Sequence, residues 1–296
     1  MTKTAWVFPG QGSQTIGMGA DLYDLPAAQE KLTQAEKILG WSVPEICQNP
    51  EDKVSKTLYT QPCLYTLEAI LVDLLRSQGL VPQLVAGHSL GEYVALYAAG
   101  VFDFEAGLHL VKRRAELMDH ASDGTMAALL GFDRAQLDAA IAKTPGVVLA
   151  NDNNEVQAVI SGSPEAVDAV ITQVRTKRSI QLNVSGAFHS PFMAAAAAEF
   201  QQVLESVTFR DAQVPVLANV EPSPAIAAAT LKERLNRQMT GAVRWREISL
   251  QFPQEGITRV VEVGPGRVLT GIIKRTCPDL VLENVSGLAH VSSCLP

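Results

Sequence analysis

Ser89 is the residue whose surroundings most clearly predict chemistry. It lies in the segment 87–91 (Gly-His-Ser-Leu-Gly), after the apolar run 84–86 and before an alanine-rich stretch that ends at Gly100. Glycine-x-serine-x-glycine between a strand and a helix is typical of a nucleophile elbow, a turn so tight that side chains at the flanking glycines would clash. The pattern predicts a nucleophilic Ser89 at the carboxyl end of a sheet, beside the positive end of a helix. The alternative is a serine that only caps that helix.

A serine nucleophile needs a base, and His189 is the best placed of the five histidines. His88 adjoins Ser89 in sequence, but its side chain should point away from the hydroxyl. His189 lies in a loop where the chain is expected to pass between two structural units. We therefore predict that His189 is the general base, the alternative being a loop histidine bonded to the backbone.

Arg114 is the third candidate. It lies in a helix expected over residues 103–118, and a period of 3.6 residues places it on the apolar face with Leu110 and Val111. A buried guanidinium needs an anionic partner. Two interpretations stay open: an internal salt bridge, or a docking point for a substrate carboxylate, which guanidinium binds in a bidentate manner.

Alternating strands and helices are expected to position these residues. A strand at 5–8 leads into the turn 9–14 (Pro-Gly-Gln-Gly-Ser-Gln), which lacks a dinucleotide-binding fingerprint because Thr15 stands where a glycine would be needed. Its amides are expected to point into a site at the carboxyl end of the sheet. Further strands are expected at 84–86, 214–219 and 259–263, and further helices at 27–39, 62–78, 230–239, 245–255 and 268–275.

The pattern changes near Gly124. Strands are expected at 125–132, 147–151, 157–161 and 180–184, with helices at 133–143 and from Ser163. The order βαββαβ is that of a small ferredoxin-like unit. We predict that residues 125–185 form this unit, inserted into a large α/β unit made of residues 1–124 and 186–296.

Composition excludes several classes of protein. The 296 residues carry a net charge of −7, and 47% are hydrophobic, which indicates a globular chain and argues against nucleic-acid binding. Four scattered cysteines (Cys47, Cys63, Cys277 and Cys294) indicate neither a metal site nor a disulfide framework. Without a signal peptide's hydrophobic region or an apolar run long enough to span a membrane, we expect a cytoplasmic protein.

Taken together, four motifs resemble a known family. The Gly-Gln-Gly-Ser-Gln loop at 10–14, the segment 87–93, Phe188-His189 and Glu-Val-Gly-Pro-Gly at 262–266 occur in this order in the acyltransferases of fatty acid and polyketide synthesis, which include malonyl-CoA:acyl carrier protein transacylases. The resemblance covers essentially the whole chain. It implies an α/β-hydrolase-like large unit and ping-pong transfer of malonyl from coenzyme A, through a serine ester, to an acyl carrier protein, with no metal or other cofactor.

The resemblance also assigns roles residue by residue. It makes Ser89 the nucleophile and His189 its base, and it gives Arg114 the malonyl carboxylate. The remaining roles it implies are oxyanion-hole amides at Gln11 and Leu90, pocket residues Gln61 and Asn153, a selectivity residue at Phe188, and a histidine-orienting backbone carbonyl at Arg244. Because the carrier proteins of this family are acidic, we expect docking at local basic residues, namely Lys177, Arg178, Lys274 and Arg275.

Two other functions are alternatives to acyl transfer. A serine hydrolase would place an acid between the serine and the histidine in chain order. Asp138, Asp152 and Asp168 fall in that interval, but all belong to the expected small unit. A non-catalytic acyl-CoA-binding protein would need neither a serine elbow nor a base.

Overall fold

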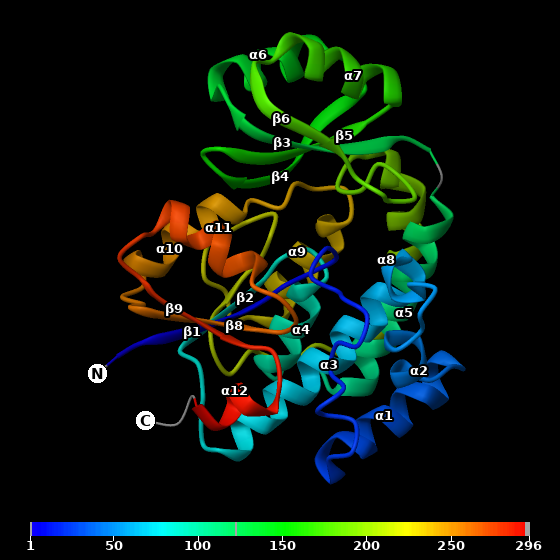
Figure 1. Ribbon diagram of the computed structural model, residues 1–296, viewed down its shortest axis with the longest axis vertical. Coiled ribbons are helices and arrows are strands. Elements are labelled where there is room, and N and C mark those ends of the chain that lie inside the picture. Colours follow the sequence, from blue (N-terminus) through cyan, green and yellow to red (C-terminus); the bar gives the residue numbers. More distant parts are fainter. Residues whose placement is uncertain (1, 122, 294–296) are drawn as a thin grey trace.

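Two separate sheets, one parallel and one antiparallel, organise the chain (Figure 1). The computed structural model describes residues 2–121 and 123–293, so Cys294 lies outside the described residues. All strand pairs of the larger sheet are parallel. In spatial order its strands are β7 (Val216–Leu217), β2 (Leu84–Gly87), β1 (Thr4–Phe8), β8 (Arg259–Val263) and β9 (Val281–Val285).

Helices cover both faces of this sheet, as its continuous apolar strands require. Trp6 and Phe8 of β1 face one helical layer, whereas Ala5 and Val7 face the other. The first layer contains α1 (Pro26–Leu39), α2 (Val43–Cys47), α3 (Thr57–Ser77), α4 (Gly91–Ala98), α5 (Phe104–His120), α8 (Ala194–Ser206), α9 (Ala228–Gln238) and α12 (Leu288–Ser293). The second contains α10 (Trp245–Gln254) and α11 (Val268–Thr276).

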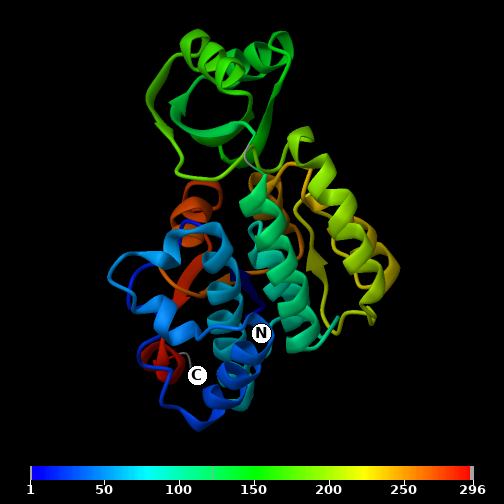
Figure 2. The same ribbon diagram turned by 90° about the vertical axis from the view of Figure 1, so that its right-hand side faces the viewer.

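The smaller sheet is antiparallel, in the order β4-β5-β3-β6. Its elements follow one another as β3 (Thr125–Phe132), α6 (Arg134–Lys143), β4 (Val147–Asn154), β5 (Gln157–Gly162), α7 (Pro164–Gln173) and β6 (Thr176–Gln181). This is the predicted ferredoxin-like arrangement. Figures 1 and 2 show it above one end of the larger unit, with α6 and α7 on its outer side. The two-sheet fold class is confirmed, while the unit boundaries at 124/125 and 185/186 stay a prediction.

Some predicted elements were misplaced. The helix expected at 62–78 begins at Thr57, so Pro62 lies inside it rather than in its first turn. The strand expected at 180–184 is β6, which ends at Gln181. No element was expected at 194–206, although a run of five alanines, the best helix former, begins α8 there.

Strand β4 attaches the small unit to the large one. The Asp152 amide donates to the Val243 carbonyl (2.9 Å), and the Val243 amide donates to that of Ala150 (2.8 Å). The carboxylate of Asp152 also pairs with Arg246 of α10 at 3.2 Å. These contacts fix the small sheet over the carboxyl ends of β1 and β2. In the described part of the chain, no helix has the length and apolar character needed to cross a membrane.

Candidate active site

The turn between β2 and α4 has the geometry of a nucleophile elbow. A Cβ on Gly87 would lie 1.9 Å from the carbonyl carbon of Gly91, and one on Gly91 would lie 2.0 Å from the Phe8 carbonyl oxygen. Neither distance is possible, so both positions must be glycine. Ser89 adopts a φ of +53°, in the left-handed region that L-residues rarely occupy. The elbow predicted from the sequence is present.

His189 contacts the nucleophile directly. Its Nε2 lies 2.8 Å from Ser89 Oγ. On the opposite side of the ring, Nδ1 lies 3.0 Å from the carbonyl oxygen of Gln238 and 3.1 Å from that of Gly241. Since a carbonyl only accepts, Nδ1 carries the proton and Nε2 is free to take one from the serine.

The prediction that Arg244 supplies the orienting carbonyl was wrong. The carbonyl of Arg244 accepts the amide of Ile248 in the first turn of α10. The chain turns between the end of α9 and this helix, and it is the carbonyls at that turn that face the imidazole. The Arg244 guanidinium points elsewhere and pairs with Glu247 at 2.5 Å.

Burial keeps His189 neutral. Loss of solvent lowers its pKa to about 3, and the positive charge of Arg114 acts in the same direction. The side chain is only 4% exposed. A neutral imidazole bonded to a serine hydroxyl is the protonation state that a general base requires.

Arg114 is buried beside Ser89 without an anionic partner. Its guanidinium donates to Gln61 Oε1 (2.6 Å), Ser89 Oγ (3.0 Å) and Gln238 Oε1 (3.2 Å), and the side chain is 1% exposed. Its Nε has no partner. None of the ion pairs found in residues 2–121 and 123–293 includes Arg114. The internal salt bridge considered above is therefore absent from the described chain.

A small cavity of about 70 Å³ opens onto these groups. Gln61 and Phe188 line it as predicted, and Met126, Leu182 and Val184 add apolar wall from the small unit and its return segment. Asn153 does not line it: its Oδ1 lies 2.9 Å from His88 Nε2, while Asn151 reaches the cavity instead. Irregularities in the register of β4 on both sides of residues 151–152 set which asparagine turns inward. The His88 ring packs against Trp245, with 5.4 Å between the ring centroids, and His88 also lines the cavity.

Gln11 and Leu90, the residues predicted to supply oxyanion-hole amides, lie at the same cavity. Gln11 and Leu90 both line it, and neither amide donates to an acceptor among the described hydrogen bonds. The two loops that carry these residues approach each other closely: a Cβ on Gly10 would lie 2.4 Å from the His88 carbonyl oxygen. Unpaired amides from two loops beside a serine hydroxyl form the arrangement that an oxyanion hole needs.

Besides Asn151, three polar residues at the site were not predicted from the sequence: Glu92, Asn219 and Gln238. All three are buried, at 1%, 0% and 0% exposure. Asn219 follows β7 at the carboxyl edge of the sheet, so its position at a strand end was an available signal. Gln238 ends α9 and carries no pattern that separates it from a surface glutamine.

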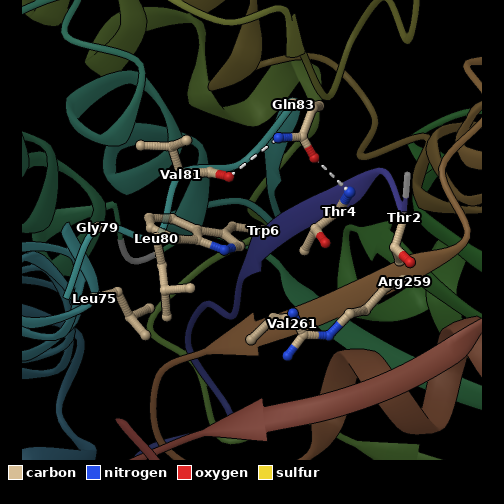
Figure 3. Close-up of a pocket in the computed structure, with 10 residues that line it drawn as sticks. All are labelled: Thr2, Thr4, Trp6, Leu75, Gly79, Leu80, Val81, Gln83, Arg259 and Val261. Carbon is tan, nitrogen blue, oxygen red and sulfur yellow. Dashed lines mark hydrogen bonds between the residues drawn. The ribbon is translucent and has the colours of Figure 1, made fainter. Parts of the chain in front are cut away.

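A larger cavity of about 210 Å³ lies at the opposite, amino-terminal edge of the large sheet (Figure 3). Trp6, Leu75 and Leu80 form its apolar wall. Some of its polar atoms bond to one another: the Gln83 side-chain amide accepts from Thr4 N at 2.7 Å and donates to Val81 O at 3.3 Å. It offers neither nucleophile nor base, so the smaller cavity at Ser89 is the candidate active site.

Known proteins share this fold and length. Residues 5–293 match the acyl transferase domain family. A malonyl CoA-acyl carrier protein transacylase from Synechocystis is 57% identical over 98% of this chain and 99% of its own length. Its crystal structure superposes with a TM-score of 0.97 over the same shares of the two chains. A complex of a type II PKS acyl-carrier protein with its malonyl-transacylase superposes with a TM-score of 0.93, at 36% identity over 99% of each chain. This chain belongs to the acyl transferase domain family.

Proposed function

We propose that this protein transfers malonyl from malonyl-CoA to the phosphopantetheine thiol of an acyl carrier protein, through an ester on Ser89. The observation that carries the proposal is Arg114, a buried guanidinium 3.0 Å from Ser89 Oγ with only neutral partners. The carboxylate of a malonyl thioester supplies the missing anion and places its carbonyl carbon at the hydroxyl. The names of the Synechocystis relative and of the carrier-protein complex support this substrate and this partner.

In the first half-reaction, Ser89 Oγ attacks the thioester carbonyl while His189 Nε2 takes the hydroxyl proton. The amides of Gln11 and Leu90 stabilise the negative oxygen of the tetrahedral intermediate. As the intermediate collapses, the carbon–sulfur bond breaks, and His189 returns the proton to the departing coenzyme A thiol. Malonyl remains as an ester on Ser89.

The second half-reaction reverses these steps with a new thiol. His189 deprotonates the phosphopantetheine thiol, the thiolate attacks the ester, and Ser89 leaves with the proton. Throughout, the carbonyls of Gln238 and Gly241 hold the Nδ1 proton and stabilise the imidazolium that forms in each half.

Arg114 also links substrate recognition to base strength. Its charge helps hold the pKa of His189 low when no anion is bound. A malonyl carboxylate offsets that charge, so the pKa of His189 rises and the imidazole becomes a stronger base. An acyl group without a carboxylate leaves the base weak.

The imidazole partners argue against a hydrolase of the Ser-His-Asp type. Asp152, one of the acids considered above, pairs with Arg134 (2.8 Å) and Arg246 rather than with His189. The proposed chemistry draws on protein side chains and backbone alone, with malonyl-CoA as substrate, and we propose no cofactor. We also propose a cytoplasmic location, since the buried cysteines Cys47, Cys63 and Cys277 are free thiols rather than disulfides, as is usual in a reducing compartment.

Mass spectrometry of the intact protein after mixing with malonyl-CoA tests the proposal. We expect a stable gain of one malonyl group, no gain in Ser89→Ala, and loss of the adduct when an acyl carrier protein is added. Steady release of free malonate would instead indicate a hydrolase, and the absence of any adduct would indicate a binding protein.

A further inference from the structure

Glu92, three residues after the nucleophile, is a buried carboxylate that the mechanism above does not use. Its side chain is 1% exposed. One oxygen, Oε2, accepts two hydrogen bonds, from the Gln238 side-chain Nε2 (2.9 Å) and from the backbone N–H of Asn219 (3.1 Å). Arg114 and Arg234 are the charged groups that act on it electrostatically. A buried carboxylate is unfavourable unless it is well bonded, so Glu92 depends on the hydrogen bonds from Gln238 and Asn219.

Both donors also hold the backbone of Ser89. The Asn219 Oδ1 accepts from the amide of Ser89 at 2.7 Å. The Gln238 Nε2 donates to the carbonyl of Ser89, also at 2.7 Å. The strained serine is thereby held on both sides by residues that themselves bond to Glu92. Such support outside the reacting groups is what keeps a nucleophile in a sparsely populated conformation.

The Gln238 amide also reaches Arg114. A side-chain amide has one accepting oxygen and one nitrogen with two hydrogens. The two hydrogens of Nε2 are directed to Glu92 and to the Ser89 carbonyl, and Oε1 accepts from Arg114 Nη2 at 3.2 Å. The opposite orientation would turn the NH₂ group toward the guanidinium, donor against donor.

An ionised Glu92 fixes which orientation is present. A carboxylate can only accept, so it holds Nε2 on its own side and leaves Oε1 for Arg114. Without it, only the Ser89 carbonyl and Arg114 itself hold the Gln238 amide, so the acceptor that aims Arg114 at the position of the substrate carboxylate is less firmly placed.

We propose that Glu92 is a positioning residue for malonyl selectivity, which acts by holding the side-chain amide of Gln238 between Ser89 and Arg114. This inference rests on the proposed malonyl transfer. We expect the loss of Glu92 to slow loading of an acyl group that has a carboxylate more than loading of one that has none.

The test compares malonyl and acetyl loading of Ser89 in wild type, Glu92→Gln and Glu92→Met. Burial raises the pKa of Glu92 to about 7, so the rates are measured at pH 8, where the carboxylate is ionised. Methionine keeps the shape and cannot fix the amide, whereas glutamine permits both orientations. We expect malonyl loading to fall at least tenfold in Glu92→Met and less in Glu92→Gln, with acetyl loading reduced no more than threefold in either. The matched control is Glu105→Met, at an exposed position in the first turn of α5.

A second variant covers the case in which Glu92→Met does not fold. Gln238→Met removes the acceptor from Arg114 directly and should lower the malonyl-to-acetyl ratio by a similar factor. In the double variant Gln238→Met/Glu92→Gln, the second change should add little, because both act through one amide.

Equal losses of malonyl and acetyl loading, or a ratio within threefold of wild type in the folded variants, would overturn the inference. Failure of the wild type to load malonyl would instead overturn the proposed function. The two failures are therefore distinguishable in one experiment.

Discussion

Arg114 Nη2 lies 3.0 Å from the Oγ of Ser89, and both groups belong to one hydrogen-bonded cluster with His189 and Gln238. A permanent positive charge this close to a nucleophile has two effects. It stabilises negative charge on the serine oxygen, and it helps to keep His189 neutral. Both effects depend on what else binds Arg114, and this dependence underlies the predictions below.

Replacing Arg114 should separate malonyl from acetyl transfer. In Arg114→Ala the malonyl carboxylate loses its guanidinium, so we expect malonyl loading to fall at least a hundredfold, about 2.7 kcal/mol, while acetyl loading stays unchanged or rises. Loading rates with both thioesters check this. Arg113→Ala is the matched control, because the neighbouring guanidinium pairs at the surface with Glu116 and Glu199. An unchanged malonyl-to-acetyl ratio would remove the main support for the substrate assignment.

The buried His189 should make stability depend on pH. Its folded pKa of about 3 lies below the ordinary value of 6.5, so the unfolded chain binds the proton more readily, and stability is lost as pH falls below 6.5. Between pH 6.5 and 5.5, the free energy of unfolding of wild type should fall by about 1 kcal/mol relative to His189→Gln. Urea unfolding of both proteins at the two pH values measures the difference. A constant difference would contradict the low pKa.

Phe188 should exclude a branched acyl group. Its ring is 5% exposed and lines the cavity beside Ser89, where it should crowd the extra methyl of methylmalonyl. We expect Phe188→Ser to improve methylmalonyl relative to malonyl loading by about 1–3 kcal/mol, the usual effect of one methyl group in a pocket. Competition between the two thioesters provides the ratio. If Phe188→Ser lowers both rates equally, the ring supports the fold of the site and does not select the substrate.

The carrier protein should dock where basic residues of the two units meet. Lys177 and Arg275 line one cavity of about 290 Å³ between the small sheet and α11, whereas Arg178 and Lys274 do not line it. We therefore expect Lys177→Glu/Arg275→Glu to slow transfer to an acidic carrier protein at least fivefold and to leave malonyl loading from coenzyme A unchanged. The control, Arg178→Glu/Lys274→Glu, makes the same change in net charge. Equal effects of the two double variants on the carrier step would rule out specific docking at this cavity.

The sequence by itself determined the nucleophile and the plan of the fold. Gly87 and Gly91 are required by contacts within one turn and with the adjacent strand, so the elbow was readable from local pattern. The βαββαβ order of the small unit was also predictable from local sequence, because each of its elements has its own periodicity and turn residues. Arg114 was recognisable because a charged residue on an apolar helix face contradicts its surroundings.

Only the tertiary structure decided which neutral groups complete the site. Gln238, 149 residues after Ser89 in the chain, supplies a carbonyl to His189 and an amide to Ser89 and Arg114. The tertiary structure also decided that the carbonyl of Gly241, and not the predicted carbonyl of Arg244, bonds to His189. It likewise decided that Asn151 lines the cavity in the place predicted for Asn153. Backbone carbonyls are common to every residue, and buried amides resemble surface amides in sequence. Their roles are set by the turn after α9 and the irregular register of β4, where long-range packing decides which atom faces the cavity.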